Sequence, residues 1–96
     1  MALVHMVCFK YKAGVDDAAW AEHRAMLDGL RSVAGVIDLK VGADVVGSGR
    51  SYDMGLVVTF PDRAALDAYQ TDPAHVPVAR HGVGLAEHIV AVDFLA

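Results

Sequence analysis

Several features that would point to a particular compartment are missing from this sequence of 96 residues. It has one cysteine, Cys8, so no disulfide can form within the chain. The place of Cys8 in an apolar run predicts a buried, inert thiol in a reducing, cytoplasmic setting. No apolar run approaches the length of a membrane span, and no charged segment followed by an apolar one suggests a leader peptide. We therefore expect no membrane partner.

Basic clusters are missing as well. The chain has 8 Lys and Arg against 12 Asp and Glu, a formal net charge of -4. Without a Lys/Arg stripe, nucleic acid is not an expected partner. Hydrophobic residues, in contrast, make up 55% of the chain, more than one small core requires. Because a short chain has much surface for its volume, we expect the excess to be covered by self-association or to line a cavity for a small hydrophobic ligand.

Metal-binding patterns are also lacking. The histidines are His5, His23, His75, His81 and His88, and no two of them have the His-x-x-x-His spacing of a helical zinc pair. No Cys-x-x-Cys pair exists, and the glycines at 47 and 49 are not set in a phosphate-binding loop. The sequence therefore predicts no metal site and no cofactor.

Hydrophobic periodicity predicts six main elements in a single domain that spans residues 1–96. A nearly continuous apolar run at the start is typical of a strand buried on both faces. Asp16 or Asp17 and Asp62 are suited to cap the two helices, and Pro73 suits the first turn of a further short helix. The expected elements are a strand over 2–11, a helix over 16–34, a strand over 36–42, a strand over 52–60, a helix over 63–70 and a strand over 88–95.

This β-α-β-β-α-β order is that of a ferredoxin-like α+β fold. An antiparallel sheet with helices on one face leaves its other face bare. Here the bare face is expected to be apolar, because the first and last strands show little polar alternation. Two such sheets packed face to face would bury it, which predicts a homodimer in the form of an α+β barrel.

Four segments of the chain resemble the stress-responsive dimeric α+β barrel (Dabb) family. They are residues 4–10, 52–60, 66–75 and 92–94, and the resemblance extends over essentially the whole chain. Its most specific part is Tyr69 followed six residues later by His75 in a Pro-Ala-His motif. The resemblance implies a homodimer whose two four-stranded sheets form a barrel, and in some members a higher oligomer. Many members are described as stress-induced proteins without an assigned activity.

One plant branch of the family, olivetolic acid cyclase, closes a linear polyketide by aldol condensation. Carried over by motif, the resemblance implies catalytic roles for Tyr69 and His75 and a place in the cavity for His5. The cavity tyrosine and histidine that the cyclase has elsewhere correspond to Met26 and Met54 here, which implies a different substrate. The candidate substrate-binding residues are Met26, Met54, Phe9 and Leu30.

The Tyr/His pair has the chemistry of proton transfer. An imidazole with an ordinary pKa of about 6.5 can take and return a proton near neutrality. A phenol can donate a hydrogen bond to a developing oxyanion. In an aldol closure, His75 would remove a proton next to a carbonyl and Tyr69 would stabilise the enolate. This predicts a cofactor-free, polyketide cyclase-like enzyme that acts on a small hydrophobic carbonyl substrate.

The same residues allow a structural interpretation. His75 can bond backbone groups at a helix start, Tyr69 can pack on the core with its hydroxyl at the surface, and His5 needs a partner in either case. The protein would then be a non-catalytic stress-responsive or ligand-binding homo-oligomer. A cavity of roughly 300 Å³ or more beside both His5 and His75 would favour the enzyme, whereas packed rings without a void would favour the alternative.

Overall fold

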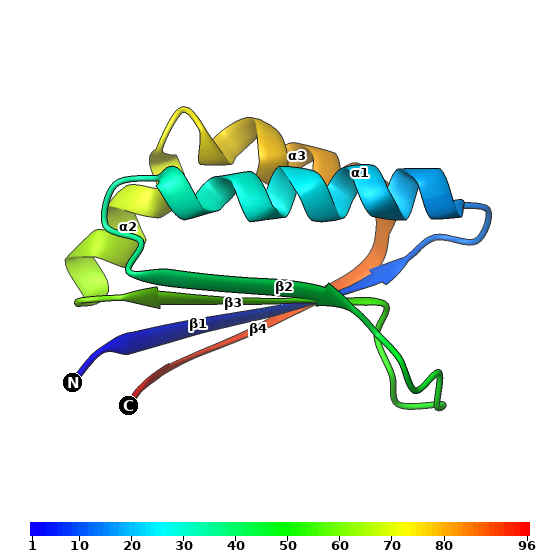
Figure 1. Cartoon of the computed structure of the whole chain (residues 1–96), viewed down its shortest axis with the longest axis horizontal. Coiled ribbons are helices and arrows are strands. Elements are labelled where there is room, and N and C mark those ends of the chain that lie inside the picture. The colour runs from blue at the N-terminus through cyan, green and yellow to red at the C-terminus, as the bar shows by residue number, and fades with distance from the viewer.

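In the computed structural model, which describes residues 1–96, all helices lie on one face of a four-stranded antiparallel sheet (Figure 1). No helix combines the length and the apolar character needed to cross a membrane. The predicted ferredoxin-like order is confirmed. The elements are β1 (Leu3–Tyr11), α1 (Asp17–Asp28), the 3-10 helix η1 (Gly29–Ser32), β2 (Asp38–Ala43), β3 (Met54–Phe60), α2 (Arg63–Thr71), α3 (His75–Leu85) and β4 (Ala86–Leu95).

The strands lie in the order β2-β3-β1-β4, so β1 is a central strand with neighbours on both sides. Its residue His5 pairs with Val58 of β3 and with Asp93 of β4. Because alternate residues of a strand point to opposite faces, this register places His5 and Asp93 on the same face of the sheet. That face is the one covered by the helices.

The first two helices begin where their caps predict. The Asp16 side chain accepts a hydrogen bond from the backbone N–H of Ala19, and Asp62 does the same for Ala65. The first helix ends earlier than expected, because α1 gives way to the 3-10 helix η1. Gly35 follows with a φ of 90°, a conformation that favours glycine.

The third helix is longer than the sequence predicts. The expected short helix with Pro73 in its first turn instead begins after that proline: α3 runs from His75 to Leu85 and includes two glycines. One of them, Gly82, is buried against His23, where an added Cβ would lie 3.1 Å from the imidazole Nε2. Close packing against α1 therefore overrides the low helix propensity of glycine.

The core lies between the sheet and the helices. Val58 and Phe60 of β3 are fully buried, and Leu27, Leu30 and Leu66 reach them from the helical layer. The inward-facing residues of β1 are all buried, namely Leu3, His5, Val7, Phe9 and Tyr11.

The opposite face of the sheet is bare in the single chain, as expected. Its apolar side chains include Met6, Val90, Val92 and Phe94, which are between 38% and 62% exposed. The expectation that the first strand is buried on both faces is therefore wrong for the chain taken alone. Only the helix-facing side of β1 is covered, because no element of the same chain reaches the outer side. Cys8 points to that outer side and is only half-buried, so the expected buried thiol is also wrong for the single chain.

A buried polar pair that the sequence did not reveal joins α1 to β1. The Tyr11 hydroxyl and Nδ1 of His23 share a hydrogen bond of 2.6 Å, and His23 is fully buried. Its Nε2 has no partner. Burial, and secondly the nearby His81, lowers the pKa of His23 to about 4. The imidazole is therefore neutral in the folded protein above that pH.

We predict that His23 makes the stability of the fold depend on pH. Between pH 6.5 and about 4 the unfolded chain binds a proton that the folded His23 does not. Its contribution is therefore fully present above pH 6.5 and is lost as the pH falls toward about 4. Urea unfolding across this range should show a smaller pH slope in His23→Phe than in the wild type. The ring of His81 lies 6.0 Å from that of His23, and Glu22 lies 3.6 Å from His81. Glu22→Gln therefore changes a charge near His23 without removing its imidazole, and this control should keep the pH slope. An unchanged slope in His23→Phe would contradict the prediction.

Candidate functional site

The candidate site is an apolar cavity of about 240 Å³ between the sheet and the helices. It is somewhat smaller than the 300 Å³ set out as favouring an enzyme, yet it opens beside both His5 and His75. Those two rings are thus separated by a void rather than packed together. The other polar lining residues are Tyr69 and Gln70, and most of the remaining wall is aliphatic or aromatic, including Val7, Phe9, Leu27, Leu30, Leu56 and Val78.

His5 is held in this cavity by an aspartate on the neighbouring strand. Its Nδ1 lies 2.5 Å from Oδ1 of Asp93, and the imidazole is almost fully buried. A carboxylate can only accept, so Nδ1 carries the proton of this hydrogen bond. In the neutral ring, Nε2 is then left with a free lone pair. Asp93 was not among the predicted site residues, although an acidic residue inside the apolar run 89–95 is the signal that could have identified it.

Tyr69 comes from the last turns of α2 and is only 1% exposed. Its hydroxyl is buried and has no hydrogen-bond partner. The structural interpretation, in which this hydroxyl reaches the surface, is therefore wrong. The ring packs against Phe60 at 5.0 Å and lies 6.1 Å from the ring of His5. A buried hydroxyl without a partner is costly. Tyr69 lines the cavity, although its hydroxyl oxygen is itself closed to a water-sized group in this conformation.

His75 is the first residue of α3, and its ring centre lies 4.2 Å from that of Tyr69. Its Nδ1 is 3.3 Å from the backbone carbonyl oxygen of Gln70. Because a carbonyl can only accept, Nδ1 carries the hydrogen and Nε2 is the basic nitrogen. The chain between α2 and α3 thus places the phenol and the imidazole together and fixes the tautomer of the latter.

Burial sets the charge state of both groups. It raises the pKa of Tyr69 to about 12, so the phenol stays protonated and can donate. It also lowers the pKa of His75; the hydrogen bond to the Gln70 carbonyl offsets part of this, and the smaller effects of His5, which lowers the pKa, and Asp72, which raises it, oppose each other. No lysine or arginine lines the cavity. No group of three or more His, Cys, Asp or Glu side chains is arranged to hold a metal ion.

The predicted lining residues divide into two pairs. Phe9 and Leu30 contact the cavity, whereas Met26 and Met54 do not. Met54 is buried on the inner face of the sheet but pairs with Phe9 at the far end of β3 from His5. Met26 is only half-buried, since α1 turns its neighbour Leu27 toward the cavity instead. The structure thus places both methionines outside this cavity, and their contacts with a substrate stay predictions.

A family model described as the stress responsive A/B barrel domain matches residues 3–96. The chain belongs to this Dabb family. None of the curated proteins matches its sequence significantly.

Solved structures share the Dabb fold over nearly their whole length. A dimeric ferredoxin-like protein of unknown function from Thermobifida fusca has a TM-score of 0.91 at 22% identity, with 100% of this chain and 92% of that chain covered. A similarly described protein from Jannaschia sp. CCS1 has a TM-score of 0.83 at 28% identity, with both chains fully covered at 100%. A hydroxynitrile lyase from Passiflora edulis has a TM-score of 0.88 at 18% identity, covering 99% of this chain and 93% of that chain.

We predict opposite effects on stability from removing the two buried tyrosine hydroxyls. Tyr69→Phe removes a hydroxyl that has no partner and should leave stability unchanged or raise it by about 1 kcal/mol. Tyr11→Phe leaves Nδ1 of buried His23 without its partner and should lower stability by about 1–3 kcal/mol. Urea unfolding of the two variants at one protein concentration compares them directly. A clear loss of stability in Tyr69→Phe would show that its hydroxyl is satisfied in solution.

Proposed function

We propose that this Dabb protein is a cofactor-free enzyme that makes or breaks a carbon–carbon bond next to a carbonyl group, as a cyclase or a lyase does. The observation that carries the proposal is the buried, unpartnered Tyr69 hydroxyl beside the His75 imidazole at an apolar cavity. An unsatisfied donor beside a base favours a substrate oxygen that accepts from it. Conversely, an apolar core residue at position 69 would serve the fold equally well.

The chemistry begins with Nε2 of His75, which is unprotonated near neutral pH. It takes a proton from the carbon next to the substrate carbonyl, and the C–H electron pair moves into the enolate. The Tyr69 hydroxyl donates to the enolate oxygen. When the enolate carbon attacks a second carbonyl, the protonated His75 returns its proton to the new alkoxide. His5, oriented by Asp93, binds a substrate hydroxyl through its free Nε2.

An uncharged substrate fits this site best. The lining offers hydrogen-bonding groups but no lysine or arginine to pair with a carboxylate or phosphate. A volume of about 240 Å³ suits a small hydrophobic molecule. The fold likeness to a hydroxynitrile lyase supports this class of reaction, because splitting a hydroxynitrile also breaks a carbon–carbon bond while a base takes the hydroxyl proton.

We propose that the enzyme works as a homodimer. The apolar outer face of the sheet lacks a covering element within the chain, and an exposed patch of this kind is typical of a protein interface. Three similar solved structures are described as dimeric. The free cysteine is compatible with a reducing compartment such as the cytoplasm.

We predict that His75→Ala and Tyr69→Phe each lower turnover by about a hundred- to ten-thousand-fold, because the first removes the base and the second removes the donor to the enolate oxygen. The assay should present a panel of neutral hydrophobic carbonyl compounds, cyanohydrins and short linear polyketones, with products followed by mass spectrometry. His88→Gln is the matched control, since His88 lies outside the cavity.

The expected result is full activity in the control and loss in both site variants, with circular dichroism unchanged. Turnover that survives His75→Ala would remove the imidazole from the mechanism. Binding of panel compounds without any turnover in the wild type would favour a non-catalytic ligand-binding protein instead.

The pH dependence of the rate gives an independent prediction. His75 must be neutral to act as a base, and its pKa lies below the ordinary value because of burial. The acid limb of kcat/KM should therefore fall below pH 6.5, so activity persists under mildly acidic conditions. A pH profile of the active wild-type protein measures this directly. An acid limb clearly above pH 6.5 would contradict the assigned role.

A further inference from the structure

The Tyr69 hydroxyl is closed off in this structure, although the proposed chemistry needs it to meet a substrate oxygen. Tyr69 is only 1% exposed, and its hydroxyl oxygen is buried without a partner. Three rings lie around it, with centres at 4.2 Å for His75, 5.0 Å for Phe60 and 6.1 Å for His5. Phe60 and His5 belong to β3 and β1, the two inner strands of the sheet. His75 belongs to α3, so this helix is the neighbour that can move most easily.

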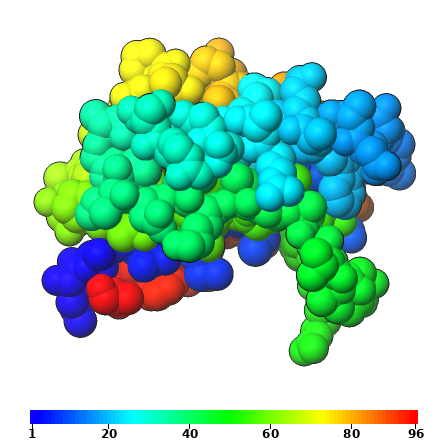
Figure 2. All heavy atoms as spheres, viewed as in Figure 1, coloured from blue at the N-terminus to red at the C-terminus, as the bar shows by residue number.

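The helix α3 is a wall of the cavity that is loosely attached to the rest of the protein. Its lining residues are His75, Val78, Ala79 and Val83. Yet Gly82 is its only buried residue, and Figure 2 shows the segment in yellow and orange at the top of the view, on the far side of the helical layer from the sheet. An element with so little buried surface opens locally at a low cost in free energy. Gly82 and Gly84 weaken it further, because glycine has a low helix propensity.

The C-terminal end of α3 is nevertheless anchored. The backbone N–H of Lys12 donates to the carbonyl of the last α3 residue at 2.9 Å, and its Nζ donates to the Gly84 carbonyl at 3.1 Å. One turn earlier, a Cβ added to Gly82 would lie 3.1 Å from Nε2 of His23 and 3.3 Å from Cε2 of Phe9. We call this contact of Gly82 with His23 and Phe9 the seat of α3.

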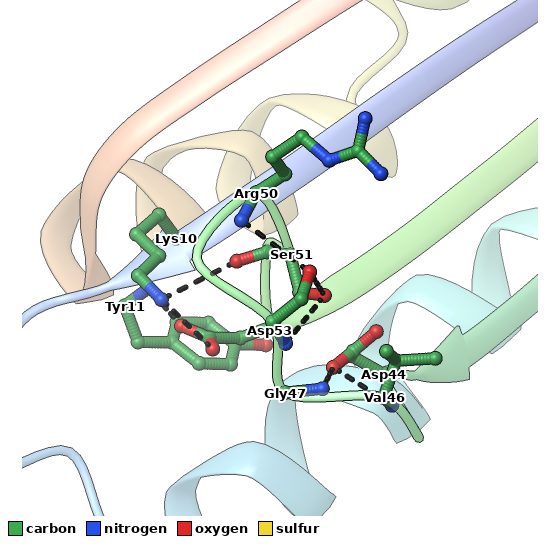
Figure 3. Close-up of polar contacts among 9 residues, drawn as sticks. Lys10, Tyr11, Asp44, Val46, Gly47, Arg50, Ser51 and Asp53 are labelled. Carbon is green, nitrogen blue, oxygen red and sulfur yellow. Dashed lines mark hydrogen bonds and ion pairs between the residues drawn. The ribbon is translucent and has the colours of Figure 1, made fainter.

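A series of hydrogen bonds holds the seat in place from below. Nδ1 of His23 shares a hydrogen bond of 2.6 Å with the Tyr11 hydroxyl. The backbone N–H of Tyr11 donates to the Asp53 carboxylate at 2.8 Å, and this carboxylate lies 3.5 Å from Nζ of Lys10 (Figure 3). His23 is thus tied through Tyr11 to the end of β1 and to the connection that precedes β3. It cannot readily give way to a side chain at position 82.

The N-terminal end of α3 is held only by its own neighbours along the chain. The Asp72 carboxylate accepts from the N–H of Ala74, and the Asp72 carbonyl accepts from the N–H groups of His75 and Val76. Nδ1 of His75 donates to the Gln70 carbonyl at 3.3 Å. None of these bonds reaches the sheet or α1. The end of the helix that carries His75 is therefore the end that can lift.

We propose that α3 is a lid that pivots on the seat at Gly82. When its first turns lift, the Tyr69 hydroxyl opens to an incoming substrate. When they close, His75 returns to a place beside the substrate that this hydroxyl holds. Closure then completes the site and excludes water in one movement. Gly82 is a positioning residue, because its seat decides where the base comes to rest. This proposal rests on the enzyme proposed above, since it explains how a substrate reaches Tyr69.

Alanine at the two glycines of α3 should have opposite effects on opening. Gly84→Ala adds a Cβ that meets nothing within 4 Å, so it only strengthens the helix and should slow hydrogen exchange of the α3 amides by about five-fold. Gly82→Ala brings the same gain in propensity but overfills the seat. Its α3 amides should exchange about ten-fold faster than those of the wild type. Exchange read by mass spectrometry under native conditions compares the three proteins, and Gly84→Ala is the matched control.

Nitration by tetranitromethane tests whether this opening is what exposes Tyr69. The reagent reaches the ring only when the lid is open, so nitration of Tyr69 should be about five-fold slower in Gly84→Ala and about ten-fold faster in Gly82→Ala. Tyr11 is the internal reference in Gly84→Ala, because it lies beneath the seat and is exposed only when the fold as a whole opens. Its nitration should change less than that of Tyr69. A role of Gly84 in helix stability alone would slow both tyrosines equally.

The outcomes separate the lid from the enzyme. Nitration of Tyr69 that ignores Gly84→Ala, or changes only as much as that of Tyr11, would overturn the lid, even where Gly82→Ala fails to fold. Slower exchange or nitration in a folded Gly82→Ala would overturn the pivot at the seat. Both measurements use the protein without substrate, so they stand whatever the turnover assay shows. A lid that opens in a protein without turnover would leave the movement established and remove the catalytic role of His75.

Discussion

The central strand β1 divides its side chains between two apolar faces, and the rest of the structure depends on that division. Its inward residues reach the core and the cavity, and they include His5, Phe9 and Tyr11. Its outward residues, Met6 and Cys8 among them, belong to the bare face of the sheet. Because the side-chain period of a strand is two, one residue of slippage would exchange the two sets. The pairing of β1 with both β3 and β4 fixes the register.

The two buried tyrosines differ in whether their hydroxyls have a hydrogen-bond partner. Tyr11 and His23 complete a hydrogen bond between β1 and α1, so that pair is a structural link. Tyr69 lies in the same interior with its hydroxyl unpaired, next to an imidazole and a void. A fold selected only for stability would remove that hydroxyl, because a buried donor without a partner lowers stability. The difference between the two sites is thus an argument for function at Tyr69.

The sequence predicted the fold well because its signals are local. Asp16 and Asp62 cap their helices as their positions imply, and the strand expected over 52–60 is β3. Contacts between distant segments were harder to foresee. The hydrogen bond between His5 and Asp93 joins residues that are 88 positions apart. The helix α3 contains Gly82, which packs closely on His23 of another helix, and this contact is not visible in the local sequence. Met26 lies outside the cavity because of how α1 is rotated over the sheet, and Met54 because it is at the far end of β3 from His5.

The outer face and the candidate site are linked through β4. This strand lies at the edge of the sheet, and its only buried residue is Ala86. Its residue Asp93 nevertheless orients His5 inside the cavity, while its neighbours Val92 and Phe94 lie on the outer face. An edge strand with so little burial is free to fray in a single chain. A second copy seated on the outer face would bury Val92 and Phe94 and hold Asp93 against His5. Self-association would then fix the orientation of His5 in the cavity as well as cover apolar surface.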